Sequence, residues 1–231
     1  MRLAEGLAEL LSPTRCAGCE LPGALLCPDC EGALPRIDPR TACPRCGAPT
    51  RGGACVECAG RAFAFAGARC LGTLEPPLSR MVVLHKDAGE RRLGAVLGAL
   101  AAEVWLATPP AAPAVPPEAV TFVPASRDAL RHRGFDHAEG IAHAVAARLG
   151  LPCVRALTRV RGGDQRALGR DARLAALSCA FAPGPEPTPP RVLLVDDVFT
   201  TGATLHAAAL ALRASGCAEV LALALARACG G

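Results

Sequence analysis

The fold is decided by one stretch near the carboxyl end of the chain, Arg191-Val-Leu-Leu-Val-Asp196-Asp197-Val-Phe-Thr200-Thr201-Gly202-Ala203-Thr204-Leu205. Its apolar, β-branched run predicts a buried strand that ends at two adjacent acids. The Thr-Thr-Gly-Ala-Thr turn leads into alanine- and leucine-rich residues, which predict a helix from Ala203 to Ala214. The order is therefore strand, acidic edge, a loop with hydroxyl groups and glycine, and helix start.

The loop after the acids has the composition of an anion site. Backbone N–H groups and threonine hydroxyls would face a phosphate at the positive end of the helix dipole. The two acids, Asp196 and Asp197, can accept hydrogen bonds from sugar hydroxyls or hold a divalent cation. We therefore predict a site for phosphate, sugar and metal, with phosphate contacts from Thr200, Thr201, Gly202, Ala203 and Thr204.

Strands and helices alternate along the rest of the chain. Further strands are predicted at 119–123 and 219–226, with one or two more within 63–74. Further helices are predicted at about 91–105 and at 138–149. Alternation of this kind specifies an α/β fold with a mostly parallel sheet flanked by helices.

A second small-residue loop follows the strand at 119–123. It consists of Val123, Pro124, Ala125, Ser126 and Arg127, and Arg131 and Arg133 follow it. Guanidinium groups match phosphate oxygens, and open α/β sheets bind ligands at the carboxyl ends of their strands. This loop is therefore a candidate for binding a polyanion such as pyrophosphate; a solvated basic helix end is the alternative.

Lys86 is the only lysine among the 25 basic Lys and Arg residues. A functional interpretation gives its ammonium group a contact with phosphate or with an acceptor molecule. The alternative is a solvated lysine beside Asp87, and the sequence alone favours that alternative.

Four Cys-x-x-Cys pairs lie in the first quarter of the chain. Each pair allows one tight turn to direct both sulfurs at the same ion, and two pairs complete a tetrahedral thiolate site. The spacing assigns one zinc to Cys16, Cys19, Cys27 and Cys30, and a second to Cys43, Cys46, Cys55 and Cys58. An interleaved pairing, first with third and second with fourth, remains open.

Zinc held by four thiolates has no open coordination position, so these sites are expected to be structural and not catalytic. The other cysteines lack the spacing and are expected to be buried small hydrophobic residues: Cys70, Cys153, Cys179, Cys217 and Cys229.

Length and composition set outer limits on the function. A chain of 231 residues with 51% hydrophobic residues fits one mid-sized domain and a small one, here 1–62 and 63–231. The net charge of +4 is mild and gives little reason to propose a nucleic-acid or membrane partner.

The first residues of the sequence are not those of a signal peptide. Residues 1–11 predict an amphipathic helix and no signal peptide, so we expect a cytoplasmic protein without membrane association. The arginine-rich segment 157–173 predicts a mobile hood.

Residues 192–205 resemble the phosphoribosyl-pyrophosphate signature of type I phosphoribosyltransferases, in which an apolar run precedes two acids and a threonine-glycine loop. The whole chain resembles the ComF family, which places a double zinc ribbon before a phosphoribosyltransferase-like domain. The marks of that family here are the four Cys-x-x-Cys pairs, Val123-Pro124, Arg133-Gly134-Phe135, Gln165, Leu168, Arg173 and Phe181. The chain departs from the family at Asp136-His137, where an Asn-Gln pair is usual, at Ala176, and at Ala125-Ser126.

The resemblance implies roles for the predicted residues. Residues 200–204 would hold the 5′-phosphate of phosphoribosyl pyrophosphate, and Asp196 and Asp197 would engage the ribose hydroxyls. Residues 123–127 would face the pyrophosphate, with Mg²⁺ bridging its oxygens to the ribose and with Arg133 and Lys86 nearby.

Two functions follow from the resemblance. The first is transfer of the phosphoribosyl group to a nitrogen acceptor. The second is an accessory role in DNA uptake, in which the zinc ribbons bind single-stranded DNA or a helicase. We favour the first, because the first fifty-eight residues contain no Phe, Trp or Tyr for stacking on single strands.

Overall fold

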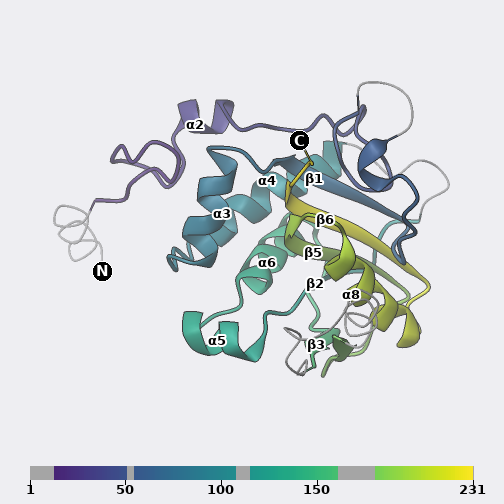
Figure 1. Ribbon diagram of the computed structural model, residues 1–231. Helices are drawn as coiled ribbons and strands as arrows, with labels where there is room; N and C mark the ends of the chain where they lie inside the picture. Colours follow the sequence, from purple (N-terminus) through teal and green to yellow (C-terminus); the bar gives the residue numbers. More distant parts are fainter. Residues whose placement is uncertain (1–12, 51–54, 108–114, 161–179, 231) are drawn as a thin grey trace, which may run out of the picture.

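The centre of the molecule is a four-stranded parallel sheet with strand order β1-β6-β5-β2 (Figure 1). The computed structural model describes residues 13–50, 55–107, 115–160 and 180–230. The strands are β1 (Gly67–Thr73), β2 (Ala119–Phe122), β5 (Arg191–Phe199) and β6 (Glu219–Arg227). The predicted α/β class with a mostly parallel sheet is confirmed. A separate antiparallel pair joins β3 (Leu157–Arg159) to β4 (Phe181–Pro183).

Helices cover both faces of the sheet. Leu193 and Val195 of β5 pack in one core with α3 (Leu78–Lys86), α4 (Leu93–Ala107) and α6 (His137–Leu149). Val192 and Leu194 point to the other face, where they share a core with α8 (Ala203–Ala214). This alternation is the period of two that a strand buried on both faces requires.

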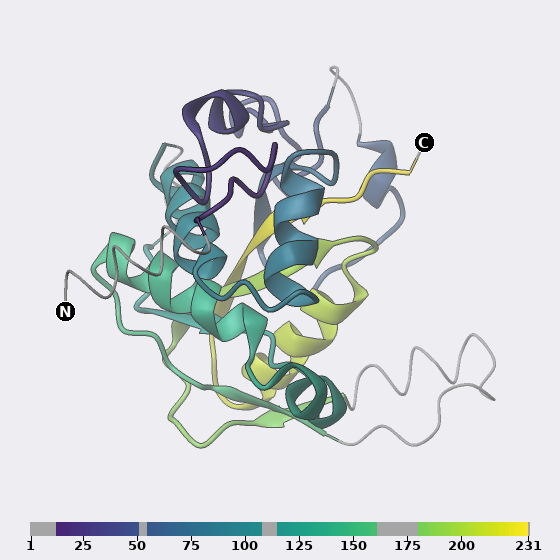
Figure 2. The ribbon, with the colours of Figure 1, turned by 90° about the vertical axis from the view of Figure 1, so that its left-hand side faces the viewer.

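The cysteine-rich segment runs along the free side of β1. The segment contains α2 (Pro28–Gly32) and the short 3-10 helix η1 (Val56–Cys58). The N–H of Ile37 donates to the carbonyl of Leu71 at 3.1 Å, and the N–H of Thr73 donates to the carbonyl of Pro35 at 2.9 Å. Figure 2 shows this N-terminal segment against the blue helices and β1. The segment therefore covers an edge strand that would otherwise expose unpaired backbone groups.

Two element boundaries differ from the sequence prediction. Strand β5 does not end before the acids but continues through Asp196 and Asp197 to Phe199, because β6 pairs with it as far as Arg227. The predicted loop 123–127 ends one residue early, because Arg127 begins the helix α5 (Arg127–Arg133), which the hydroxyl oxygen of Ser126 caps by accepting from the N–H of Ala129.

The cysteines outside the two clusters follow the prediction in part. Cys70 and Cys217 are buried, as expected. Cys153 is half-buried, and the prediction was wrong for Cys229, which is exposed in the tail that follows β6. Cys179, the helix at 1–11 and the hood residues 161–173, with Gln165, Leu168 and Arg173, lie outside the described residues, as does Ala176.

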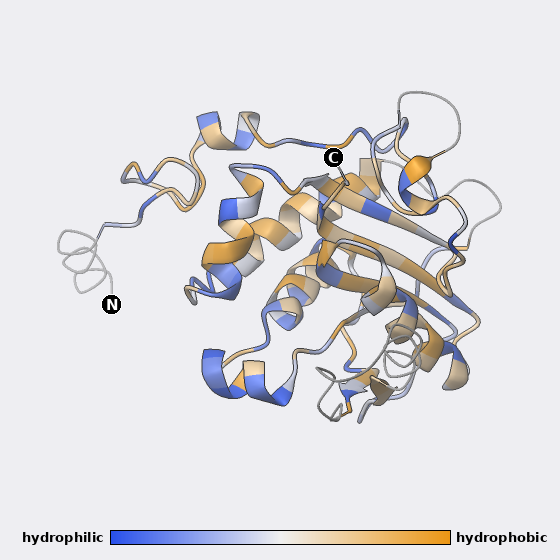
Figure 3. Cartoon of the chain, in the orientation of Figure 1, coloured by the Kyte–Doolittle hydropathy of each residue, from blue (hydrophilic) through white to orange (hydrophobic). Residues whose placement is uncertain are grey.

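Hydrophobic residues concentrate in the central strands and in α4, whereas α5 is mostly hydrophilic (Figure 3). Within the described ranges, the helices are too short or too polar to span a bilayer. The division at residue 62 and the cytoplasmic location remain predictions.

The close approach of α4 and α6 gives a test of this packing. A methyl group at Gly98 would lie 2.6 Å from the carbonyl oxygen of Ile141, so Gly98→Ala forces the two helices apart. We expect the free energy of unfolding to fall by about 1–3 kcal/mol in denaturant titrations. Gly140→Ala is the matched control, because a methyl group there meets no atom within 4 Å, and it should gain up to about 1 kcal/mol. Equal effects from the two substitutions would contradict the packing.

Candidate functional site

Asp197 is a buried carboxylate near the end of β5, with 5% of its surface exposed. It forms an ion pair with Lys86 and lies 3.3 Å from Nε2 of His137. It also accepts the N–H of Val198 at 2.9 Å. Burial alone would raise its pKa, but the hydrogen bond from His137 and the charge of Lys86 outweigh burial and hold the pKa well below its usual range.

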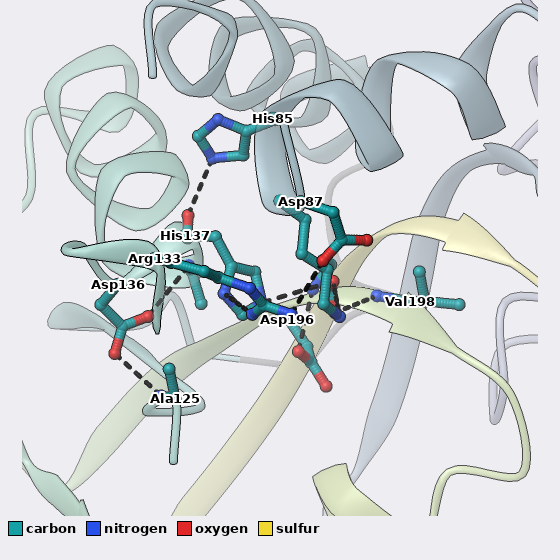
Figure 4. Close-up of polar contacts among 11 residues, drawn as sticks. His85, Asp87, Ala125, Arg133, Asp136, His137, Asp196 and Val198 are labelled. Carbon is teal, nitrogen blue, oxygen red and sulfur yellow. Dashed lines mark hydrogen bonds and ion pairs between the residues drawn. The ribbon is translucent and has the colours of Figure 1, made fainter. Parts of the chain in front are cut away.

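The contacts of Asp197 continue outward through His137. Arg133 donates to Nδ1 of His137 at 3.4 Å and to a carboxylate oxygen of Asp87 at 2.9 Å (Figure 4). Because a guanidinium group only donates, Nδ1 accepts and the imidazole proton lies on Nε2, facing Asp197. The resulting network of charged and polar side chains consists of Asp87, Arg133, His137, Asp197 and Lys86.

Lys86 occupies the last position of α3, and its side chain is 30% exposed. The sequence favoured a lysine solvated beside Asp87, and that interpretation was wrong: Lys86 pairs with Asp197, and Asp87 pairs with Arg133. The neighbouring His85 is buried, with its two ring nitrogens 3.1 Å from the carbonyl oxygens of Glu90 and His137. These contacts fix the end of α3 against α6 and so place Lys86.

Asp196 has the opposite electrostatic character. Its carboxylate is buried, and it accepts the N–H of Asp197 at 2.9 Å. Burial and the neighbouring charge of Asp197 raise its pKa well above the ordinary value. The acid pair therefore combines one carboxyl group with a lowered pKa and one with a raised pKa.

The loop between β5 and α8 has the backbone of an anion site. Gly202 is the N-cap of α8 and has a left-handed conformation, with φ of 79°. Thr200 and Thr201 are exposed, and the Thr201 hydroxyl accepts the N–H of Ala203 at 3.4 Å. Because α8 has twelve residues and no acid in its first turn, its positive end is open to a phosphate. Ala203 and Thr204 are its first two residues.

The second predicted loop lies beside the acid pair. Phe122 of β2 pairs with Val195 of β5, so Val123 follows at the level of Asp196. Pro124, Ala125 and Ser126 complete the loop, and the Ala125 N–H donates to Asp136 at 2.8 Å. Arg133 joins the network around Asp197, as described above. Arg127 and Arg131, in contrast, have exposed side chains on α5, where Arg131 pairs with Asp128.

Two residues of the site were missed by the sequence prediction. His137 contacts Asp197, and Asp136 both caps α6, by accepting the N–H of Ala138 at 3.1 Å, and holds the Ala125 loop. An Asp placed before a helical run is a common N-cap, so that signal was present for Asp136. The contact of His137 depends on how α6 packs on β5, and the local sequence carries no signal for it.

Both predicted cysteine clusters are present. The four sulfurs within each cluster lie within 4.8 Å of one another, in the groups 16, 19, 27, 30 and 43, 46, 55, 58. The interleaved pairing is therefore wrong. The Cys43–Cys58 and Cys46–Cys55 sulfur distances are 3.7 and 3.6 Å. A tetrahedral zinc with Zn–S bonds of about 2.3 Å places its sulfurs about 3.8 Å apart, so the second cluster fits structural zinc.

Comparisons with known proteins give distant likenesses. No protein-family model and no curated protein matches the chain. An allosteric regulatory enzyme of purine biosynthesis matches 57% of this chain and 26% of its own, with 20% identity and a TM-score of 0.39. An adenine phosphoribosyltransferase from Leishmania tarentolae matches 59% of this chain and 58% of its own, with 19% identity and a TM-score of 0.33. The chain spans less than two thirds of either protein, and TM-scores of this size support no inference about its function.

Metal content tests the two clusters. We expect two zinc ions per chain, and Cys27→Ser or Cys55→Ser should each remove about one, because three thiolates bind zinc more weakly than four. Cys229→Ser is the control, since Cys229 belongs to neither cluster, and it should retain both ions. Elemental analysis of the purified protein provides the measurement. Iron, or one zinc in the unmodified chain, would contradict the assignment.

The raised pKa of Asp196 predicts a stability gain when its charge is removed. A carboxyl group whose pKa is higher in the folded state stabilises the fold at low pH, and this contribution is lost as pH rises through the folded pKa. Because burial and the charge of Asp197 raise the pKa of Asp196 in the folded chain, Asp196→Asn should raise the free energy of unfolding at pH 7. The gain should shrink towards pH 4 in denaturant titrations.

Asp128→Asn controls for the loss of a charge at an exposed position. It should change stability little at either pH. A gain for Asp196→Asn that is the same at pH 4 and pH 7, or a loss at pH 7, would show that Asp196 is not strained by burial.

Proposed function

We propose that this chain binds phosphoribosyl pyrophosphate with Mg²⁺ and transfers its phosphoribosyl group to a nitrogen acceptor. One observation carries the proposal: the buried acids on β5 lie within a few residues of the open positive end of α8. A ribose with a phosphate on its 5′ position offers hydroxyl groups to the acids and a phosphate to the helix end, so it matches both parts of this site. The sequence signature at 192–205 supports the same ligand.

The proposed contacts divide the ligand among three parts of the site. Residues 200–204 hold the 5′-phosphate, and Asp196 and Asp197 engage the ribose hydroxyls. Residues 123–127 face the pyrophosphate, with Arg133 and Lys86 as the nearby cations. Mg²⁺ would supply positive charge against the pyrophosphate, and the carboxylates of Asp196 and Asp197 are the groups that could hold it, because oxygen ligands are those that it prefers.

The reaction needs positioning and charge stabilisation. The bond from the anomeric carbon to the pyrophosphate oxygen breaks, the new carbon–nitrogen bond forms, and the acceptor nitrogen loses a proton. No covalent intermediate on the chain is required, and the charge that develops on the departing pyrophosphate is met by fixed cations.

Lys86 has different proposed partners in the free and the ligand-bound site. Without ligand its ammonium group neutralises Asp197. When the ribose hydroxyls bind Asp197, they compete with that ion pair. The flexible and partly exposed lysine is then free to turn towards the pyrophosphate. The DNA-uptake role rests on the family resemblance alone.

Calorimetric titration with phosphoribosyl pyrophosphate and Mg²⁺ tests the proposal. The unmodified chain should bind saturably, and Asp197→Asn should weaken binding about 10- to 100-fold, because a hydrogen bond to a charged group is worth about 1.5–3 kcal/mol. Asp128→Asn, which removes an exposed acid on α5, should bind as the unmodified chain does. Absence of binding, or equal binding by Asp197→Asn, would reject the site.

Pyrophosphate release in the presence of candidate nitrogen acceptors tests the transfer step. An acceptor that stimulates release in the unmodified chain and not in Asp197→Asn would identify the reaction. If phosphoribosyl pyrophosphate binds but ammonia, purines, pyrimidines and simple amines all fail to stimulate pyrophosphate release, the transfer step is rejected and only the binding function remains.

A further inference from the structure

The carbonyl groups at the start of the phosphate loop are held by a buried arginine. Arg227, at the end of β6, has 1% of its surface exposed. Its guanidinium group donates to the carbonyl oxygens of Phe199 at 3.1 Å and Thr200 at 2.7 Å, and it stacks on the ring of Phe199 at 4.8 Å. The charge of Arg227 therefore fixes the backbone where β5 passes into the loop.

The partner of Arg227 belongs to the second cysteine cluster. A carboxylate oxygen of Glu57 lies 3.4 Å from the guanidinium group. Glu57 is the middle residue of η1, between the cluster cysteines Cys55 and Cys58. It also accepts the N–H of Gly230 at 3.3 Å, and Figure 2 shows the C-terminal tail beside this turn. A buried arginine requires such a counter-ion, because an unpaired buried charge is strongly destabilising.

The chain that leaves the cluster holds the other side of the same loop. Arg61 donates to the carbonyl oxygen of Thr201 at 3.0 Å. The N–H of Ala64 donates to the ring nitrogen of His206, in the first turns of α8, at 3.0 Å. Phe63 packs edge-on against Phe199, with ring centres 5.9 Å apart. The carbonyl oxygens of residues 199, 200 and 201 thus accept hydrogen bonds from two arginines. Arg227 pairs with Glu57 of the cluster turn, and Arg61 follows the cluster in the chain.

We propose that the second cysteine cluster sets the conformation of the phosphate loop through the positioning residues Glu57, Arg61 and Arg227, so that metal binding and phosphate binding are coupled. The loop carbonyls accept from these arginines, which leaves the N–H groups of residues 201, 202 and 204 to face an anion, while the N–H of Ala203 donates to the Thr201 hydroxyl. The phosphate ligand of the loop rests on the proposed function. The contacts of Glu57, Arg61 and Arg227 that hold the loop, here called the clamp, do not depend on that ligand.

The first cluster makes different contacts. Its Gly18 carbonyl accepts from Arg80 of α3 at 3.3 Å, and Glu20 pairs with Arg80. These contacts lie on the α3 side of the sheet, and α3 ends at Lys86. Metal at the first cluster is therefore expected to leave the phosphate loop unchanged, which supplies an internal control.

Glu57→Gln tests the clamp in the zinc-loaded full chain. The substitution keeps the size of the side chain and removes the charge that balances Arg227. Amide hydrogen exchange should become faster in residues 199–204, and calorimetry should show ribose 5-phosphate bound about 10-fold more weakly, the worth of one hydrogen bond to a charged group. Glu31→Gln, an exposed acid of α2, should change neither.

Hydrogen exchange separates this proposal from the proposed function. If the unmodified chain does not bind ribose 5-phosphate, the ligand assignment fails, while faster exchange in Glu57→Gln still supports the clamp. Unchanged exchange at 199–204 in a folded Glu57→Gln chain overturns the clamp whatever the ligand result. If Glu57→Gln does not fold, Arg61→Gln carries the test, because Arg61 is exposed and its loss leaves the core intact.

Metal dependence tests the coupling. Cys55→Ser should raise exchange in residues 199–204, and Cys27→Ser, the same change in the first cluster, should not. By reciprocity of linked equilibria, saturating ribose 5-phosphate should raise the zinc affinity of the second cluster in chelator competition. Glu57→Gln should abolish that rise. Equal effects of Cys55→Ser and Cys27→Ser, or a zinc affinity that ribose 5-phosphate does not change, would overturn the coupling.

Discussion

A buried negative charge near the end of β5 organises the elements around it. Asp197 cannot remain ionised in the interior without cations or donors, and it obtains them from α3 through Lys86 and from α6 through His137. His137 in turn accepts a hydrogen bond from Arg133, the last residue of α5, and Arg133 forms an ion pair with Asp87. One carboxylate thus fixes the relative positions of three helices and the sheet.

The two acids show how a site departs from the rules of stable folding. Asp197 is paired with Lys86 and His137, whereas the buried Asp196 faces the charge of its neighbour and has a raised pKa. An ionised acid in that position is unfavourable for the free chain, because burial and a like charge both oppose it. Local conflicts of this kind are expected where a chain binds a ligand.

Sequence patterns predicted what is local and missed what the topology brings together. The strand-loop-helix order around Gly202 and the grouping of the cysteines follow from short-range spacing, and both are confirmed. The extension of β5 through the acids depends on its pairing with β6, which the four-residue apolar run 192–195 does not encode. Lys86 and Asp197 are 111 residues apart, so only the packing of α3 reveals that they meet.

The cysteine-rich segment packs against the sheet and contacts its edge strand. It pairs with the free edge of β1, and Cys43, Cys46 and Cys58 are buried in the same core as β5 and α8. Metal binding supplies folding energy to a segment with few large apolar residues. The segment also contacts the loop after β5, because Glu57 pairs with Arg227 and Arg227 donates to the Thr200 carbonyl. A structural metal site without an open coordination position can therefore influence ligand binding. It does so through a residue between two of its ligands, here Glu57 between Cys55 and Cys58.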